Sequence, residues 1–466
     1  MSLTQSPPET IARKLEGEWR QLCQSHLPIR PAGSMWWYNR KGNRADPCQG
    51  WKLHVSATIL SACAIFRSIF PCLLRHRVMF KAPRSLKDLQ QLNAGVFYGF
   101  HQVGKFVTIY PPSTGAAVEL AEELDRLTAH QPAPVIPYDE PLRPGSCVYY
   151  RYGQFQFAQK RNGGTKSTLT IVRPDGRLVP DRREPGAAVP RWLADPFQRK
   201  APAPAPAKLT KLETSFGDFE ALVQRGRGGL YRALDFSTMP AKTCIIKEGR
   251  RHGETDWLGR DGFDRIKREM EFLKKVSPLV HAAPRVIRTF RANHGYYLVM
   301  EHIPGKSLQA VITSRERISA RRTLRYCLQM ARILADLHSA GWAWRDCKPA
   351  NFLCRPNHEL LAVDFESACR MNQPDSLWIE TPGYFAPRRT VANPEADDLY
   401  ALGASIAQLV LRTAQPPAPG VFLKSKTSQP GLPTTFVQVT KSLLELEPCR
   451  RPGARVVALM LERICE

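Results

Sequence analysis

The spacing of hydrophobic and polar positions differs between the two halves of the chain. The first half contains short runs in which apolar and polar residues alternate, such as WKLHVSA, GKFVTIYP, CVYYRYGQF and KSTLTIV, and a helix-like stretch from Thr114 to His130. Alternation with a period of two predicts half-buried strands, and a longer amphipathic stretch predicts a helix. We therefore expect an α+β domain over residues 50–199, preceded by a loosely structured lead-in at residues 1–49.

The second half shows strand patterns first and helix patterns afterwards. EALVQRG, GLYRALD and CIIKEG predict three strands, a polar amphipathic helix follows around Phe263 to Val276, and a strand pair ends in YYLVMEHI. The remaining sequence is mostly helical in pattern. This order of elements is expected of a second, larger domain over residues 209–466.

A change of composition separates the two halves. Residues 200–208 read KAPAPAPAK, which alternates Ala and Pro. Proline lacks the amide proton that a helix or sheet needs, so this stretch should run as a stiff, extended linker. We place the domain boundary there.

The charge balance narrows the choice of partners. The 466 residues suffice for two or three domains, and 67 Lys and Arg against 42 Asp and Glu leave a net charge of +25. Such an excess favours phosphate, nucleic acid, an acidic lipid surface or an acidic peptide as a partner. The chain shows no known nucleic-acid-binding motif and no basic tail, so we expect no nucleic-acid partner.

The N-terminal sequence and the cysteines indicate the compartment. The first residues, MSLTQSPPET, are polar, and no apolar run is long enough to cross a bilayer, so we expect neither a signal peptide nor a membrane segment. Twelve cysteines are scattered without a C-x-x-C pair, which argues against a zinc ribbon, a redox motif or a disulfide scaffold. Reduced thiols in the cytoplasm are the expected state.

The most specific motif lies in the second half. WRDCKPANFLCRPNHELLAVDFESA places four polar residues in the order and spacing of the protein-kinase catalytic loop and metal-binding strand. Asp346 supplies a carboxylate that orients an attacking hydroxyl and accepts its proton, and Lys348 supplies a cation near the transferring phosphoryl group. Asn351 and Asp364 supply the oxygen ligands that Mg²⁺ prefers.

Upstream residues fit the binding of ATP or another nucleoside triphosphate. Gly226, Gly228 and Gly229 form a turn between two predicted strands, where bare backbone amides can approach phosphate oxygens. A glycine turn in a hairpin is more often structural. Here it precedes Lys247 on a third strand and Glu269 on the next helix, a combination that resembles the kinase ion pair that positions nucleotide phosphates.

The resemblance to protein kinases extends over nearly all of residues 212–466. TPGYFAP and DDLYALG are similar to the end of an activation segment and the buried helix behind it. Three residues depart from the pattern: Trp344 replaces the usual His, Glu366 replaces the Gly of the Asp-Phe-Gly motif, and Arg388 stands where a Glu is usual. Regulation by flipping of this loop is therefore not expected. The alternative is a pseudokinase, a folded domain without catalytic activity. The presence of all the catalytic residue types argues against it.

Single cations recur in the apolar strands of the first half. In GWKLHVSAT, Lys52, His54 and Ser56 share one face of the strand, and the apolar residues between them share the other. Lys81 ends RVMFK, Lys105 opens GKFVTIYP, and Arg151 lies in YYRYG. Scattered cations are usually solvated, so the residues alone leave a shared site open.

The order of these strings resembles a known family. GWKLHVSAT, the Phe-Lys pair at 80 and 81, GKFVTIYP, YRYGQF and WLADPF, followed by a kinase-like domain, look like the N-terminal lyase domain of class III and class IV lanthipeptide synthetases. That domain is related to phosphothreonine lyases. The resemblance implies β-elimination of phosphate from phosphoserine or phosphothreonine. It assigns Lys81 to removal of the α proton, Lys52 to the enolate, His54 to the leaving phosphate, and Lys105 and Arg151 to phosphate binding.

The two resemblances together imply a bifunctional peptide dehydratase. The kinase-like domain would phosphorylate Ser or Thr of a ribosomal precursor peptide that carries a leader, and the lyase-like domain would expel the phosphate to give dehydroalanine or dehydrobutyrine. The resemblance also implies a zinc-dependent cyclase domain after the kinase domain, which we do not expect in this sequence because its Cys and His zinc ligands are not found. Either a separate cyclase closes the rings, or the rings form unaided, or the product stays linear. Two alternatives remain: a Ser/Thr kinase without lyase activity, and a non-catalytic scaffold that binds peptide.

Overall fold

The computed structural model describes most of the chain: residues 7–155, 169–198, 215–292, 295–373, 381–387, 393–418, 421–422 and 431–466. The Ala/Pro stretch at 200–208 and position 388 lie outside these ranges. The chain divides into two compact units. Unit 1 comprises Met1–Tyr231, Lys247–Arg265 and Phe290–Tyr297, and unit 2 comprises Arg232–Ile246, Ile266–Thr289 and Leu298–Glu466.

A six-stranded sheet forms the centre of the N-terminal part of unit 1. Its order is β1-β3-β4-β2-β6-β5, and β2 lies in the interior, antiparallel to both β4 and β6. Each alternating run named above contributes a strand, which confirms the mixed character of this part. The bounds are β1 Trp36–Tyr38, β2 Gln49–Val55, β3 Met79–Pro83, β4 Val107–Tyr110, β5 Glu140–Pro141 and β6 Val148–Gln154; β7 Thr170–Val172 and β8 Leu178–Pro180 pair separately.

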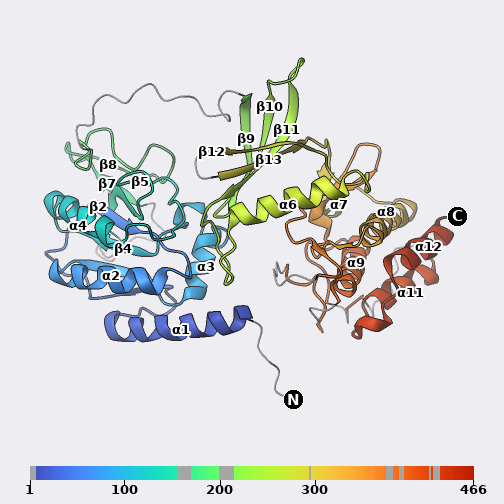
Figure 1. The fold of residues 1–466 in the computed structure, drawn as a ribbon, viewed down its shortest axis with the longest axis horizontal. Helices are drawn as coiled ribbons and strands as arrows, with labels where there is room; N and C mark the ends of the chain where they lie inside the picture. The colour runs from blue at the N-terminus through green and yellow to red at the C-terminus, as the bar shows by residue number, and fades with distance from the viewer. Residues whose placement is uncertain are drawn as a thin grey trace. The chain divides into compact units, whose positions relative to one another are not determined.

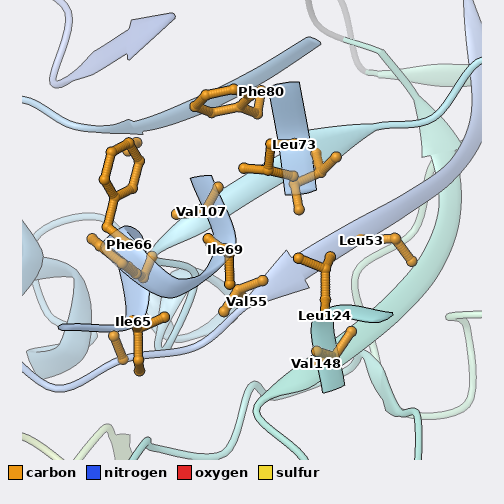
Figure 2. Close-up of a cluster of buried hydrophobic side chains, with 14 of the residues drawn as sticks. Leu53, Val55, Ile65, Phe66, Ile69, Leu73, Phe80, Val107, Leu124 and Val148 are labelled. Atoms are coloured by element: carbon orange, nitrogen blue, oxygen red, sulfur yellow. The ribbon is translucent and has the colours of Figure 1, made fainter. Parts of the chain in front are cut away.

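Helices cover the apolar face of this sheet (Figure 1). They are α1 Pro7–His26, α2 Ala62–Arg75, α3 Leu86–Ala94 and α4 Thr114–Leu127, with the short η1 at Phe100–Gln102. Ser113 caps α4 by accepting a hydrogen bond from the Ala116 amide. Figure 2 shows Leu53 and Val55 of β2 in one cluster with Ile65, Phe66 and Leu124 of the helices, all of which are buried. The apolar half of the strand alternation is thus the core.

The loosely structured lead-in expected before residue 50 is wrong for the described residues there. α1 is a helix of 20 residues, and its Trp19 is fully buried. The Trp19 Nε1 donates a hydrogen bond to the Pro83 carbonyl at 3.0 Å, and the indole meets Phe66 edge-on with ring centroids 5.2 Å apart. β1 pairs with β3. The apolar positions Trp19, Cys23 and Leu27 recur every four residues among charged ones, which is the signal that identifies this helix.

The kinase-like part begins with a five-stranded sheet of order β12-β13-β11-β10-β9. These strands precede or flank α6 Gly262–Val276, the amphipathic helix expected there. Their bounds are β9 Phe216–Arg225, β10 Gly228–Asp235, β11 Lys242–Arg250, β12 Val286–Ala292 and β13 Gly295–Glu301. Strands followed by helices is the order that the sequence predicts.

Unit 2 continues mainly with helices, in which α8 packs against α9 and α12. No helix among the described residues is both long enough and apolar enough to cross a bilayer. The helices are α7 Leu308–Thr313, α8 Ala320–Ser339, α9 Pro394–Leu411, α11 Thr434–Leu443 and α12 Ala454–Cys465. The short elements are β14 Lys306–Ser307, β15 Trp342–Ala343, η3 Pro349–Asn351, β16 Phe352–Cys354, β17 Leu360–Ala362, β18 Cys369–Arg370 and η4 Pro448–Arg450.

Truncation of Trp19 tests whether α1 belongs to the fold. Because the indole is fully buried, we expect Trp19→Ala to lower the free energy of unfolding by about 3–5 kcal/mol. The neighbouring exposed Arg20 is the matched control, and Arg20→Ala should change stability by less than about 0.5 kcal/mol. Urea denaturation measures both. Equal stability of the two variants would show that α1 does not pack on the sheet in solution.

Candidate active sites

The predicted cations of the first half lie in two rows across the polar face of the six-stranded sheet. Lys81 on β3 is opposite Thr108 on β4, which is opposite His54 on β2. Two residues along β2, Lys52 is opposite Arg151 on β6. Directly opposite residues on neighbouring strands project to the same face, so the pairing brings these side chains together. All of the cations in these rows are buried.

Asp139, in the loop before β5, connects one group of these residues. Its Oδ1 accepts a hydrogen bond from Lys105 Nζ at 3.2 Å and lies 3.7 Å from Arg151 Nε. Its Oδ2 lies 2.7 Å from His54 Nδ1, which is within ion-pair distance. Lys105, which precedes β4, therefore shares one carboxylate with His54 and Arg151.

Asp181, which directly follows β8, connects the second group. Its Oδ1 accepts a hydrogen bond from Arg151 Nη2 at 2.6 Å, and its Oδ2 lies 3.8 Å from Lys52 Nζ. A Cβ atom at Gly153 would lie 2.8 Å from Asp181 Oδ2, so glycine is needed for the carboxylate to approach the strand. Arg151 therefore bridges the two carboxylates.

Arg183 is a further cation of this site that the sequence reasoning missed. Its charge lowers the pKa of Lys81, Lys105 and His101, and its own pKa is lowered by burial and by Arg151. Within the described part of the chain, no hydrogen bond or ion pair to another side chain engages Arg183. Asp139 and Asp181 were missed as well. All three lie in loops, where no strand periodicity indicates the direction of a side chain.

Burial and mutual repulsion set the protonation of the lysines. Burial, followed by the charges of Arg183 and Lys105, lowers the pKa of Lys81 to about 7. Burial also lowers the pKa of Lys105, to about 8, although Asp139 opposes the shift. An amine with a pKa near 7 is partly neutral at physiological pH and can accept a proton. Lys81, whose Nζ lies 4.4 Å from the centre of the Trp36 ring, is thus a suitable base.

Burial favours the neutral form of His54. Burial lowers the pKa of His54 to about 3; Asp139 opposes this shift, and Lys105 and Lys52 add to it. Burial would raise the pKa of Asp139, but Lys105, His54 and Arg151 outweigh burial and hold it below its usual value. The carboxylate is therefore ionised. A phosphate dianion beside His54 would favour its protonated form, so we expect the acid role to depend on the presence of substrate.

The pKa of Lys81 predicts the pH dependence of elimination. Lys81 must be neutral to take a proton, and its neutral fraction rises with pH through about 7. With a synthetic phosphothreonine peptide, which is a dianion above about pH 6.5, we expect kcat/KM for elimination, which reports the pKa of the free enzyme, to rise with pH and level off near pH 8. Phosphate release measures the rate. A profile that stays flat between about pH 6.5 and 9 would exclude Lys81 as the base.

In unit 2, the catalytic loop positions Asp346 through both carboxylate oxygens. Lys348 Nζ donates to Asp346 Oδ2 at 2.7 Å and to Thr381 Oγ1 at 2.8 Å, and Thr381 Oγ1 donates to Asp346 Oδ1 at 3.0 Å. Asn351 Nδ2 donates to Asp346 Oδ2 at 2.8 Å. Burial raises the pKa of Asp346, and Lys348 opposes this shift. The two predicted catalytic residues of the loop are therefore in direct contact.

Asp398 of α9, the helix that contains DDLYALG, binds the backbone of this loop. Its carboxylate accepts hydrogen bonds from the backbone amides of Trp344 at 2.7 Å and Arg345 at 2.5 Å, and from His338 Nε2 at 3.0 Å. Burial would lower the pKa of His338, but Asp398 and Glu395 raise it to about 9. The loop backbone is thus held by a fully buried, ion-paired carboxylate.

Trp344, which replaces the usual His, contacts the segment that carries the predicted metal ligand Asp364. Its Nε1 donates to the Asp364 carbonyl at 3.0 Å, and its ring lies 5.2 Å from that of Phe365. The Phe365 ring also stacks on Phe272 of α6, and the Phe365 amide donates to Glu269 Oε1 at 3.0 Å. Phe365 is thus clamped on two sides, which supports the expectation that this segment does not flip.

The two predicted metal ligands have the right chemistry for a hard cation. The side-chain nitrogen of Asn351 donates a hydrogen bond to Asp346, which leaves the side-chain oxygen available as a metal ligand. Asp364, whose backbone has φ +68°, contributes a carboxylate. Oxygen donors of this kind suit Mg²⁺. Lys247 lies on β11, in unit 1, whereas Glu269 lies on α6, in unit 2. The ion pair between them stays a prediction.

The glycine turn between β9 and β10 is packed tightly against backbone. The Gly226 amide donates to the Ala94 carbonyl at 3.0 Å, and a Cβ atom at Gly226 would lie 1.6 Å from the Asn93 carbonyl oxygen. A Cβ atom at Gly228 would lie 1.7 Å from the Glu248 carbonyl oxygen, whereas one at Gly229 would meet only the end of the Tyr231 side chain. Gly226 and Gly228 thus have a structural reason to be glycine, and their nucleotide-binding role stays a prediction.

Alanine at Gly226 tests this packing. Because the methyl group has no room, we expect Gly226→Ala to lower the thermal midpoint of unfolding by several degrees, which corresponds to roughly 2 kcal/mol. Gly229→Ala is the matched control, since the Tyr231 side chain can move, and it should shift the midpoint little. Differential scanning fluorimetry measures both. If the two variants melt alike, the contact at Gly226 is not formed in solution.

These observations define a protein with a kinase-type phosphoryl-transfer loop and a separate buried, cation-rich site. Residues 24–208 match the family described as RamC, N-terminal domain, and residues 228–458 match the protein kinase domain. The chain therefore belongs to the proteins in which a RamC N-terminal domain precedes a protein kinase domain. This result confirms the resemblance that the sequence motifs indicated.

Relatives among characterised proteins agree with this assignment. The chain is 30% identical over 410 residues to the probable SapB synthase of Streptomyces coelicolor, which covers 85% of this chain and 41% of that protein. It is 25% identical over 257 residues to serine/threonine-protein kinase B of Synechocystis, 49% of this chain and 43% of that protein. The chain thus spans less than half the length of these relatives. The kinase domain implies the use of ATP and a divalent metal, and its relatives support phosphotransferase activity.

Proposed function

We propose that this chain dehydrates Ser and Thr residues of a ribosomal precursor peptide by phosphorylation followed by β-elimination. The observation that carries the proposal is the crowding of buried cations on one face of the six-stranded sheet around two carboxylates. This surplus of positive charge suits a phosphate dianion, which is the product of the kinase step. The similarity to a SapB synthase supports the same proposal.

In the first step, the kinase domain transfers a phosphoryl group to a Ser or Thr hydroxyl. Asp346 orients the hydroxyl and accepts its proton, and Lys348 stabilises the charge that develops on the transferring group. ATP supplies the phosphoryl group, and Asn351 and Asp364 would hold Mg²⁺, which would offset the negative charge of the phosphates. The contacts among Asp346, Lys348 and Asn351 fix the carboxylate before any substrate binds.

In the second step, the cations on the sheet remove the phosphate. Lys105, Arg151 and Arg183 bind its oxygens. Lys81 takes the α proton, and Lys52 stabilises the negative charge on the carbonyl oxygen of the resulting enolate. The electron pair then forms the Cα=Cβ bond as the Cβ–O bond breaks, and His54 gives a proton to the departing phosphate. The products are a dehydrated residue and inorganic phosphate.

Ring formation is not part of the proposed activity. Ring closure by a separate protein, unaided ring closure and a linear product are all compatible with the two proposed steps. The alternatives to the proposal are a Ser/Thr kinase without lyase activity and a peptide-binding scaffold. Incubation with Mg²⁺, ATP and the precursor peptide separates these possibilities by mass: loss of water indicates both steps, gain of phosphate indicates the kinase alone, and an unchanged peptide favours the scaffold.

Two substitutions separate the two proposed steps. We expect Lys81→Ala to accumulate phosphopeptide, because the kinase loop is intact and the base is missing. We expect Asp346→Asn to abolish phosphorylation but to leave elimination from a synthetic phosphopeptide unchanged. Mass spectrometry of the peptide measures both. Lys41→Ala, at an exposed lysine, is the control and should dehydrate normally. Normal dehydration by the Lys81 variant would refute the assignment of the lyase site.

A further inference from the structure

A surface cavity in unit 2 is lined partly by residues between Asn351 and Asp364 of the kinase motif, but by none of the residues assigned to the two reactions. Its volume is about 360 Å³. Val311 of α7, Tyr326 of α8 and the hairpin that follows β16 form its walls. The full lining is Gly305, Lys306, Val311, Glu316, Tyr326, Cys354, Arg355, Pro356 and His358. None of these residues has a role in the two-step reaction described above.

The walls of the cavity are fixed by specific contacts. The Arg412 guanidinium donates to the carbonyls of Ile312 at 2.9 Å and Glu316 at 2.7 Å, which holds the segment after α7 in place. A Cβ atom at Gly305 would lie 2.4 Å from the Cys354 carbonyl oxygen, so the chain approaches β16 as closely as glycine allows. The cavity is thus a built feature of the fold.

Its floor combines apolar surface with a small polar cluster. Tyr326, which is 1% exposed, has its hydroxyl 3.1 Å from Cys354 Sγ and 3.1 Å from His358 Nδ1. Val311 and Pro356 add aliphatic surface beside the ring. A floor of this kind accepts an apolar side chain and has few groups that would bind a bare anion.

The rim of the cavity is basic. Residues 305–326 contain six Lys or Arg residues and one acidic residue, Glu316. Lys306 and Arg355 line the cavity itself, and Arg315, Arg317, Arg321 and Arg325 along the same segment are exposed. Arg322 pairs with Glu316. Arg355 makes one exposed ion pair with Glu359 at 3.0 Å, through Nη1, and its other guanidinium nitrogens can bind a second carboxylate, so the rim keeps a net positive charge. The charge complements an acidic partner.

We propose that this cavity is a docking site for an acidic peptide segment that carries an apolar anchor residue. Resting on the proposed function, the occupant is part of the precursor peptide outside its modified residues. The anchor fills the cavity over Tyr326, and the acidic side chains pair with Lys306, Arg355 and the exposed arginines of the rim. Docking at this position would raise the local concentration of the peptide at the kinase domain without any contact to the reacting atoms.

A binding measurement tests the docking site without reference to catalysis. The probe is a fluorescein-labelled synthetic peptide of alternating Glu and Leu, and its affinity is read by fluorescence anisotropy. We expect Lys306→Glu combined with Arg355→Glu to weaken binding about tenfold, since two attractive contacts become repulsive. The matched control carries the same charge change at the exposed Arg455 and Arg463 of α12, outside the cavity lining. It should bind within about twofold of the parent, since only the overall charge differs.

The outcomes are distinguishable from those of the dehydration assay. With a Ser-containing test peptide, fusion of the Glu/Leu segment should lower KM for phosphorylation by the parent protein, and the cavity variant should lose this gain while phosphorylating the unfused peptide normally. Equal loss of affinity in the cavity and control variants would overturn the proposal. The proposal would also be overturned if inorganic phosphate, or a peptide of alternating Glu and Ala, competed with the probe as strongly as the unlabelled Glu/Leu peptide does. Should the double variant fail to fold, Lys306→Ala and Arg355→Ala replace it.

Discussion

The imbalance of buried charge on the polar face of the six-stranded sheet is the constraint on which the rest of the N-terminal domain depends. Lys52, Lys81, Lys105, Arg151 and Arg183 interact there with Asp139 and Asp181. Burying an unpaired cation costs several kcal/mol. Because the two carboxylates can balance only two of the five cations, the rest of this positive charge is uncompensated. The protein responds by lowering lysine pKa values, and a lysine so affected becomes a base. The same surplus charge is what a phosphate dianion would neutralise.

The kinase domain has the opposite arrangement, because buried carboxylates lie in and beside its catalytic loop. Asp346 and Asp398 lie far apart in the sequence, and the fold brings Asp398 to the backbone amides just before Asp346. Each carboxylate is supplied with donors: a lysine, an amide and a threonine hydroxyl for Asp346, and two backbone amides and a histidine for Asp398. Hydrogen bonds to the charged form stabilise it. The two sites thus differ in charge: the first has a surplus of buried cations, and the second has buried carboxylates that are supplied with hydrogen-bond donors.

The sequence predicted the faces of the strands well and the loops poorly. Alternation in GWKLHVSAT placed Lys52 and His54 on one face because a strand has a fixed period of two, and the pairing of β2 with β4 and β6 then joins them to Lys81 and Arg151. Asp139, Asp181 and Arg183 lie in loops, which have no such period. α1 was missed because its charged residues outnumber the buried ones. The glycine turn shows a further limit, since close backbone packing and phosphate binding both require glycine.

The most direct test of this account measures protons rather than products. Binding of a dianion to a site whose amines and imidazole have lowered pKa values must shift those values upward, so the complex takes up protons from solution. Titration calorimetry of a non-hydrolysable phosphonate analogue of phosphothreonine, repeated at pH 8 in buffers of different ionisation enthalpy, gives the number of protons exchanged. The account predicts net uptake of protons on binding. Binding without proton exchange, or with proton release, would contradict it.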